Sequence, residues 1–121
     1  MSSGARRADW VYIDDVANAF LLAAITPGLE GRTLDVGTGK LTSVREIVER
    51  LVRICDVNVS PIFGAIPERS NEQEQFADVE VSEACMAWRA QTGLDDGLAR
   101  TVNFYRRQMP VVSKPDSRAM E

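Results

Sequence analysis

The chain has 121 residues, of which 45% are hydrophobic and 26% charged, which is the composition of a globular domain and gives room for one. Its formal net charge of -4 argues against a protein that binds nucleic acid or an anionic membrane through a basic face. No apolar run approaches the roughly 20 residues that span a bilayer and the first residues lack the apolar core of a signal peptide, so a cytoplasmic protein is expected.

The first predicted unit is a short strand followed by a helix. Residues 10–13 form a run of aromatic and branched residues that is typical of a strand. From Val16 the apolar residues recur at helical spacing, until Pro27 ends the helix. Asp14 and Asp15 are neighbours that point in different directions, so helix capping is favoured over a catalytic or metal-binding carboxylate pair.

The second predicted unit has the same order. Residues 32–36 are a strand candidate, and Ser43 and Glu46 have the spacing of a capping box at the start of a helix. The apolar residues of that helix fall on one stripe, formed by Val44, Ile47, Val48, Leu51, Val52 and Cys55. Residues 57–62 are predicted as a further strand, which Pro61 places at an edge or a strand end.

The remainder is predicted as a long loop over residues 64–75, a helix within residues 78–88 and a last helix that Pro110 ends. The apolar face of the last helix carries Leu98, Val102, Tyr105 and Met109. We therefore expect one mixed α/β domain over residues 1–109, with about four helices and short strands, and a flexible tail over residues 110–121.

The chemistry open to this chain is narrow, because histidine is absent. That absence excludes His-based acid–base catalysis, Ser–His and Cys–His nucleophile pairs, and imidazole metal ligands. The Gly37-Thr38-Gly39 turn lacks the third glycine of a dinucleotide fingerprint, since Thr42 stands there, and P-loop spacing fails as well. A tight turn that leads into a capped helix is favoured over a phosphate site.

Arg69 lies in the predicted loop. A lone arginine in a polar loop is usually solvated, and residue types alone favour that interpretation. A guanidinium group is, however, also suited to two-point binding of a phosphate, so both interpretations stay open at this point.

Five short motifs, in this order and near this spacing, resemble the C-terminal portion of the extended short-chain dehydrogenase/reductase family, the NAD-dependent nucleotide-sugar epimerases and dehydratases. The motifs are DWVYIDDVA at 9–17, LDVGTG at 34–39 followed by Ser43 and Glu46, PER at 67–69, AD at 77–78, and GLARTV at 97–102 with FYR at 104–106. The resemblance covers residues 4–107, and the fold it implies is a Rossmann-type epimerase without its N-terminal cofactor domain.

The resemblance implies a substrate site at Trp10, Asp35 and Arg69. Arg69 matches a family arginine that binds the diphosphate, which reverses the interpretation from residue types, and Trp10 matches an aromatic position close to the substrate. Asp35 stands where the family has asparagine, and a carboxylate repels a diphosphate unless it is protonated or paired. Ala8 stands where the family usually has an arginine near the phosphates, so a weakened phosphate clamp is expected.

The resemblance also shows what the sequence lacks. Family members have a glycine-rich NAD-binding turn and a Tyr-x-x-x-Lys pair for proton transfer. Tyr12 and Tyr105 are followed four positions later by Val16 and Met109 instead of lysine. We therefore expect no catalytic residue, no metal and no cofactor in this chain, although NAD is implied for the full-length family.

Three functions stay open. The first is the substrate-binding portion of a nucleotide-sugar epimerase or dehydratase, which binds a nucleotide-diphosphate sugar and is not catalytic as this chain. The second is a protein-interaction or oligomerisation module derived from that family. Without a cofactor half, apolar side chains within residues 10–24 would be exposed, which predicts a homodimer or a complex with a separate cofactor-domain chain. The third is an unrelated small α/β protein.

Overall fold

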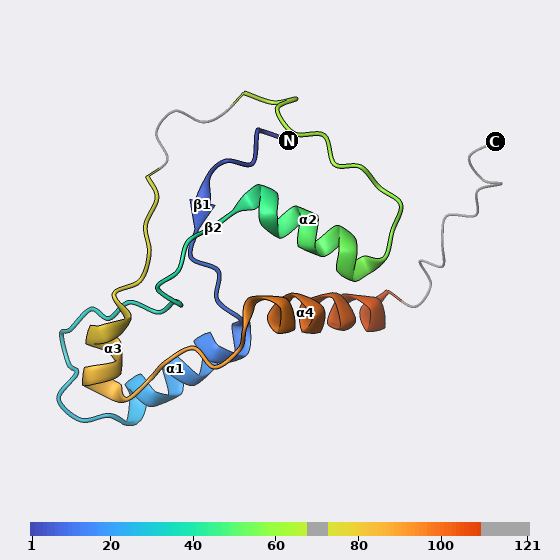
Figure 1. Ribbon diagram of the computed structural model, residues 1–121. Coiled ribbons are helices and arrows are strands. Elements are labelled where there is room, and N and C mark those ends of the chain that lie inside the picture. The colour runs from blue at the N-terminus through green and yellow to red at the C-terminus, as the bar shows by residue number, and fades with distance from the viewer. Residues whose placement is uncertain (68–72, 110–121) are drawn as a thin grey trace.

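The computed structural model describes residues 1–67 and 73–109, and this part of the chain folds as four helices and two very short strands (Figure 1). In chain order the elements are β1 (Arg7–Ala8), α1 (Ile13–Ile25), β2 (Thr42–Ser43), α2 (Val44–Cys55), α3 (Val79–Met86) and α4 (Leu94–Gln108). The mixed α/β class and the number of helices agree with the sequence-based prediction.

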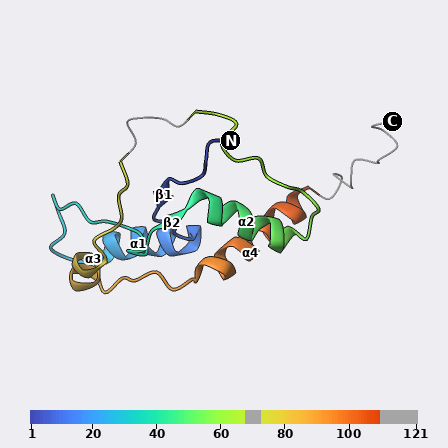
Figure 2. The same ribbon diagram turned by 45° about the horizontal axis from the view of Figure 1, so that its top comes forward.

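The helices form two pairs that lie at opposite ends of the described chain. Helix α2 packs beside α4 and α3 lies beside α1, an arrangement that both views show (Figures 1 and 2). Strands β1 and β2 lie between the pairs and run antiparallel, with Arg7 opposite Ser43 and Ala8 opposite Thr42. The strands contact each other and the start of α2, which follows β2 directly.

The core around α1 is small. Ala19, Met86 and Trp88 are buried together, and six half-buried apolar residues surround them. These six are Val11, Leu22, Leu29, Leu34, Val36 and Ala90. In the other pair, Ile47 of α2 is the buried apolar residue.

Helix α2 confirms its prediction. Every residue of the predicted apolar stripe is buried or half-buried, whereas Arg45, Glu49 and Arg53 are exposed. The hydroxyl of the N-cap residue Ser43 accepts a hydrogen bond from the amide of Glu46 at 3.1 Å, as the capping box requires.

Helix α1 begins earlier than predicted. Its first residue is Ile13, and the N-cap residue Tyr12 makes no side-chain capping bond. Asp14 and Asp15 are therefore not caps, although their negative charges lie in the first turn, where they favour the positive end of the helix dipole. The predicted strand over residues 10–13 is wrong, because this segment is the entry into α1 and the strand lies just before it.

Two more predicted strands are wrong. Residues 32–36 and 57–62 adopt neither helix nor strand. Apolar alternation favours a strand only when another strand is available to pair with it, and the sheet of the described residues has just two strands.

The C-terminal helices agree with the prediction more closely. Helix α3 falls within residues 78–88, and α4 ends at Gln108, two residues before Pro110, the predicted stop. Leu98 and Val102 of the α4 face are half-buried, but Tyr105 and Met109 are 58% and 50% exposed, so the predicted face is covered along only part of its length.

Candidate functional site

The carboxylate of Asp9 holds three distant segments together. One oxygen accepts hydrogen bonds from the amide and the hydroxyl of Thr38, at 2.8 and 2.6 Å. The other accepts from the amides of Gly39 and Ala77, at 2.8 and 3.0 Å. We call Asp9 and these three partners the Asp9 joint.

The charge of Asp9 is stabilised by these donors. Burial alone would raise the pKa of this carboxyl, but the hydroxyl of Thr38 and the three backbone amides outweigh it, so the pKa of Asp9 lies below its usual value. Asp9 is therefore ionised at neutral pH, and it supplies the anion that the glycine-rich turn binds.

The turn itself leaves no room for another group. A Cβ atom at position 37 would lie 2.6 Å from a carboxylate oxygen of Asp9 and 2.7 Å from the Cβ of Ala77, so only glycine fits there. The amide of Lys40 also has a partner, the hydroxyl of Thr38 at 3.2 Å. These amides already have acceptors and a carboxylate lies against them, so this turn does not fit a nucleotide phosphate, in agreement with the favoured prediction.

Two of the three predicted substrate-binding residues lie beside this joint. Trp10 follows Asp9 directly, its side chain is partly exposed, and its indole nitrogen donates to the carbonyl of Thr42 at 3.0 Å. Asp35 is exposed on the other side, and its carboxylate accepts from the amide of Asp78 at 3.0 Å. The segment at 77–78 therefore binds both regions, because the amide of Ala77 donates to Asp9, the neighbour of Trp10, and the amide of Asp78 donates to Asp35.

The third predicted residue, Arg69, lies outside the described residues. The described chain on both sides of it is anchored to the N-terminal segment. Before it, the amide of Ile66 donates to the carbonyl of Met1 at 3.2 Å. After it, Glu74 forms an ion pair with Arg7 at 2.8 Å, which holds the pKa of the Glu74 carboxyl below its usual value.

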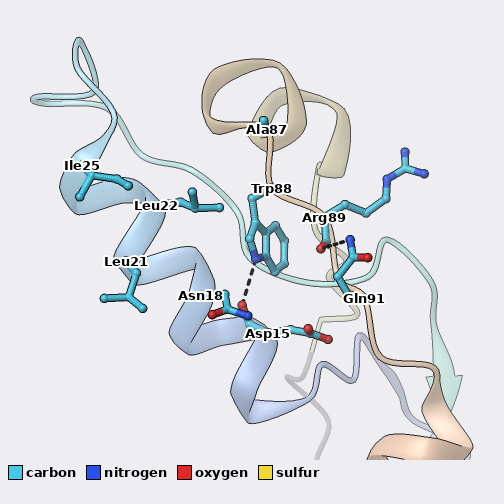
Figure 3. Close-up of a pocket in the computed structure, with 9 residues that line it drawn as sticks. All are labelled: Asp15, Asn18, Leu21, Leu22, Ile25, Ala87, Trp88, Arg89 and Gln91. Atoms are coloured by element: carbon cyan, nitrogen blue, oxygen red, sulfur yellow. Dashed lines mark hydrogen bonds between the residues drawn. The ribbon is translucent and has the colours of Figure 1, made fainter.

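A pocket of about 330 Å³ lies between α1 and the segment that follows α3 (Figure 3). Trp88 forms its inner wall, where the indole nitrogen donates to the backbone carbonyl of Asp15 at 3.0 Å. The Asp15 carboxylate is buried and accepts from the amide of Thr92 at 3.0 Å. The pocket is lined by Asp15, Asn18, Leu21, Leu22, Ile25, Ala87, Trp88, Arg89 and Gln91.

Residue-by-residue reasoning missed the structural roles of Asp9 and Asp15. Asp9 stands in the first family motif, but its donors are about 30 and 68 residues away, so no local pattern marks it. The sequence favours a helix cap at Asp15, but its buried carboxylate accepts from the remote amide of Thr92, which is a tertiary role.

Among the described residues, no group of three or more histidine, cysteine or carboxylate side chains is placed to hold a metal ion. In the same part of the chain, no helix combines the length and the apolar character that a membrane span requires.

Comparison with known proteins gives clear relatives, although no family model matches the chain. The UDP-glucose 4-epimerase of Mycolicibacterium smegmatis is 30% identical over 105 residues, which are 87% of this chain and 33% of that protein. A solved UDP-glucose 4-epimerase with UDP-glucose from Thermotoga maritima is 26% identical, with a TM-score of 0.81 over 90% of this chain and 34% of that one. The structure of MoeE5 in complex with UDP-glucuronic acid and NAD is also 26% identical, with a TM-score of 0.79 over 89% of this chain and 36% of that one.

The chain therefore spans about a third of the length of the relatives that it matches. The sequence comparison and the structure comparison both find UDP-glucose 4-epimerases, which confirms the resemblance drawn from the five motifs. The chain is therefore homologous to NAD-dependent nucleotide-sugar epimerases and dehydratases of the short-chain dehydrogenase/reductase type, and it matches about a third of the length of such an enzyme.

Proposed function

We propose that this chain forms the substrate-binding portion of a nucleotide-sugar epimerase or dehydratase and catalyses no reaction as this chain alone. The observation that carries the proposal is the Asp9 joint, because it ties the motifs at 9–17, 34–39 and 77–78 into one place. Two relatives of the same fold hold UDP-sugars, which supports a ligand of that class.

Each proposed binding residue has a stated role. Trp10 offers a partly exposed aromatic ring whose nitrogen is already bonded, so the ring is fixed for contact with the substrate. The Asp35 carboxylate is paired with a backbone amide, which reduces its repulsion of a diphosphate. Arg69 supplies the positive charge for the diphosphate, as the motif match implies.

The residues present do not fit NAD. The Asp9 carboxylate already occupies the amides of the Gly37-Thr38-Gly39 turn, which leads toward helix α2. The Tyr-x-x-x-Lys pair is absent from the sequence. Hydride transfer and proton transfer therefore need groups that this chain does not carry. We expect no turnover when the pure chain is mixed with NAD and UDP-glucose or dTDP-glucose.

The test is a calorimetric titration of the purified chain with UDP-glucose and dTDP-glucose. Arg69→Ala should weaken binding at least about tenfold, because a charge-assisted phosphate contact contributes roughly 1.5–3 kcal/mol. The matched control is Arg53→Ala, which removes an exposed arginine of α2 outside the five motifs and should leave the affinity unchanged. Absence of binding in a folded sample, or equal losses in both variants, would contradict the proposal.

A second candidate function is a protein-interaction module derived from the same family. The observation that favours it is the outward face of α1, where Phe20 and Leu21 are 69% and 65% exposed. Exposed apolar side chains in such numbers are typical of an interface.

A further inference from the structure

Helix α4 carries opposite charges at its two ends. Asp95 and Asp96 lie in its first turn. Arg106 and Arg107 lie in its last turn. These charges are favourable near the ends of the helix dipole, so the pattern stabilises α4 itself. The same pattern makes α4 complementary in charge to a second α4 helix that runs in the opposite direction.

One side of α4 is already occupied within the chain. Asp95 forms an ion pair with Arg50 of α2 at 2.6 Å, and Arg106 donates to the carbonyl of Cys55 at the end of α2, at 3.1 Å. The half-buried apolar residues between these two contacts share this side by their helical spacing: Leu98 and Val102. One charge at each end of α4 is therefore used for contact with α2.

The opposite side of α4 faces solvent, and we call it the α4 outer face. Its residues recur at helical spacing and are all exposed: Asp96, Arg100, Asn103, Phe104 and Arg107. Within the described residues, α2 is the one helix that packs along α4, and it lies on the other side (Figures 1 and 2). The α4 outer face is therefore available to another molecule.

The charges of the α4 outer face differ in their partners. Asp96 forms an ion pair with Arg100, one turn away, at 3.2 Å, and the guanidinium of Arg100 also lies 5.7 Å from the centre of the Tyr12 ring. Arg107 is exposed and has no carboxylate partner in the part of the chain that the structure describes. Phe104 is 57% exposed beside it. The face thus carries an unpaired cation and an aromatic ring near one end and a carboxylate at the other.

Two copies of this face match when they pack antiparallel about a twofold axis that passes between Arg100 and Asn103. Asp96 of each copy then lies opposite Arg107 of the other, because the two residues lie equally far along the helix from that axis. Phe104 of each copy lies near Arg100 of the other, and a guanidinium stacks favourably on an aromatic ring. A parallel pair would place like charges together instead.

We infer that the α4 outer face binds a second copy of this chain as an antiparallel helix pair. The inference is independent of the proposed substrate site, since no residue of this face belongs to that site. Symmetry forms every contact twice, so two ion pairs and two ring contacts hold the dimer. An interface of one helix pair is small, so we expect a weak and reversible dimer.

The test is sedimentation equilibrium of the full chain at protein concentrations from about 1 μM to about 1 mM, a range that covers weak association. We expect a dimer whose dissociation constant rises with salt, because salt screens exposed ion pairs. Asp96→Lys and Arg107→Glu should each weaken the dimer at least about tenfold, since symmetry turns two attractions into two repulsions. The matched control is Arg53→Glu, which makes the same change at an exposed arginine in the last turn of α2 and should leave the dimer unchanged.

Mixing the two charge-reversal variants makes the test specific to the antiparallel arrangement. A heterodimer of Asp96→Lys with Arg107→Glu has a lysine opposite a glutamate at one contact and the original pair at the other. The mixture should therefore associate about as tightly as the unsubstituted chain, although each variant alone does not. Circular dichroism of each variant confirms that its helices are folded.

Four outcomes would overturn the inference. The first is a chain that stays monomeric up to about 1 mM, and the second is a dimer that neither charge reversal weakens. The third is a loss in Arg53→Glu as large as that in Arg107→Glu, and the fourth is a mixture of folded variants that does not regain association. Nucleotide-sugar binding is measured separately, so its presence or absence does not decide the result.

Discussion

Helices α1 and α2 have similar lengths, 13 and 12 residues, but opposite relations to solvent. Helix α2 turns its apolar stripe toward α4 and most of its charged residues toward water, whereas Arg50 is half-buried and forms an ion pair with Asp95 of α4 at 2.6 Å. Helix α1 buries Asp15, which is 3% exposed, and leaves Ile13 and Phe20 67% and 69% exposed. The partner of α2 lies within this chain, whereas the described residues contain no cover for the outer face of α1.

The difference teaches that the stability of each helix has a different source. Helix α2 has an apolar contact and a side-chain cap. Helix α1 is held on its inner side by Ala19 and by polar contacts of Asp15, and its entry is fixed by the Asp9 joint. Substitutions should therefore act very differently on the two helices.

The largest expected effect is a difference in the free energy of unfolding between substitutions of two apolar residues, Ile47 of α2 and Phe20 of α1. Ile47→Ala should lower the free energy of unfolding by about 2–4 kcal/mol, because Ile47 is 4% exposed and its removal leaves a cavity between α2 and its neighbours. Phe20→Ala should change it by less than about 0.5 kcal/mol, although phenylalanine is larger. Urea denaturation of both variants measures the difference.

A large loss of unfolding free energy in Phe20→Ala would contradict this difference between the two helices. That result would mean that the outer face of α1 is covered in solution by the pure chain itself. Repeating the measurement at several protein concentrations identifies this case, because a stability that depends on association rises with concentration.

A second prediction concerns the polar attachment of α1. Asp9→Asn should lower the free energy of unfolding at pH 7 by about 1.5–3 kcal/mol, since it removes a charged acceptor of four hydrogen bonds. The pKa of Asp9 is lowered in the folded chain, so its contribution is complete above the ordinary carboxyl pKa of 3.8 and is lost as the pH falls through the lower folded pKa.

The difference between wild type and Asp9→Asn should therefore narrow below about pH 4. Denaturation midpoints from pH 7 to pH 3 measure it. Asp14→Asn is the control, because Asp14 is an exposed carboxylate in the first turn of α1 and should cost less than about 1 kcal/mol. A difference that stays constant down to pH 3 would show that the joint does not depend on the Asp9 charge.

The same contrast explains which features the sequence could predict. The capping box and stripe of α2 are local patterns, and they gave its start and its buried face. The predicted strands at 32–36 and 57–62 would need another strand to pair with, and the residues of these segments do not show whether such a strand is present. The Asp9 joint depends on donors from two segments that are remote from Asp9 in sequence, at 38–39 and at 77, so only the resemblance to a family brought these segments together before the structure did.

The candidate site divides in the same way. The family motifs predicted that Trp10 and Asp35 belong to one site, and the structure describes the contacts of both residues. No local pattern indicated the amide of Asp78 as the partner of Asp35. The role of Arg69 rests on the motif match and stays a prediction. What sequence reasoning lacked is the network of side chain to backbone bonds, which residue types alone do not define.

The smallest predicted effect tests how much the side-chain cap of α2 contributes to stability. Ser43→Ala should cost about 1 kcal/mol, because it removes the hydroxyl that accepts from the amide of Glu46, and Ser43→Asp should restore most of that loss. Hydrogen exchange at the Glu46 amide should quicken in Ser43→Ala, whereas amides in the first turn of α1 should not change, since Tyr12 caps that helix without a side-chain bond. If exchange quickens equally in both helices, the loss of the α2 cap also destabilises α1, and the stabilities of the two helices are coupled. A loss confined to α2 would establish that its start is a local property of the sequence, while α1 depends on contacts from elsewhere in the fold.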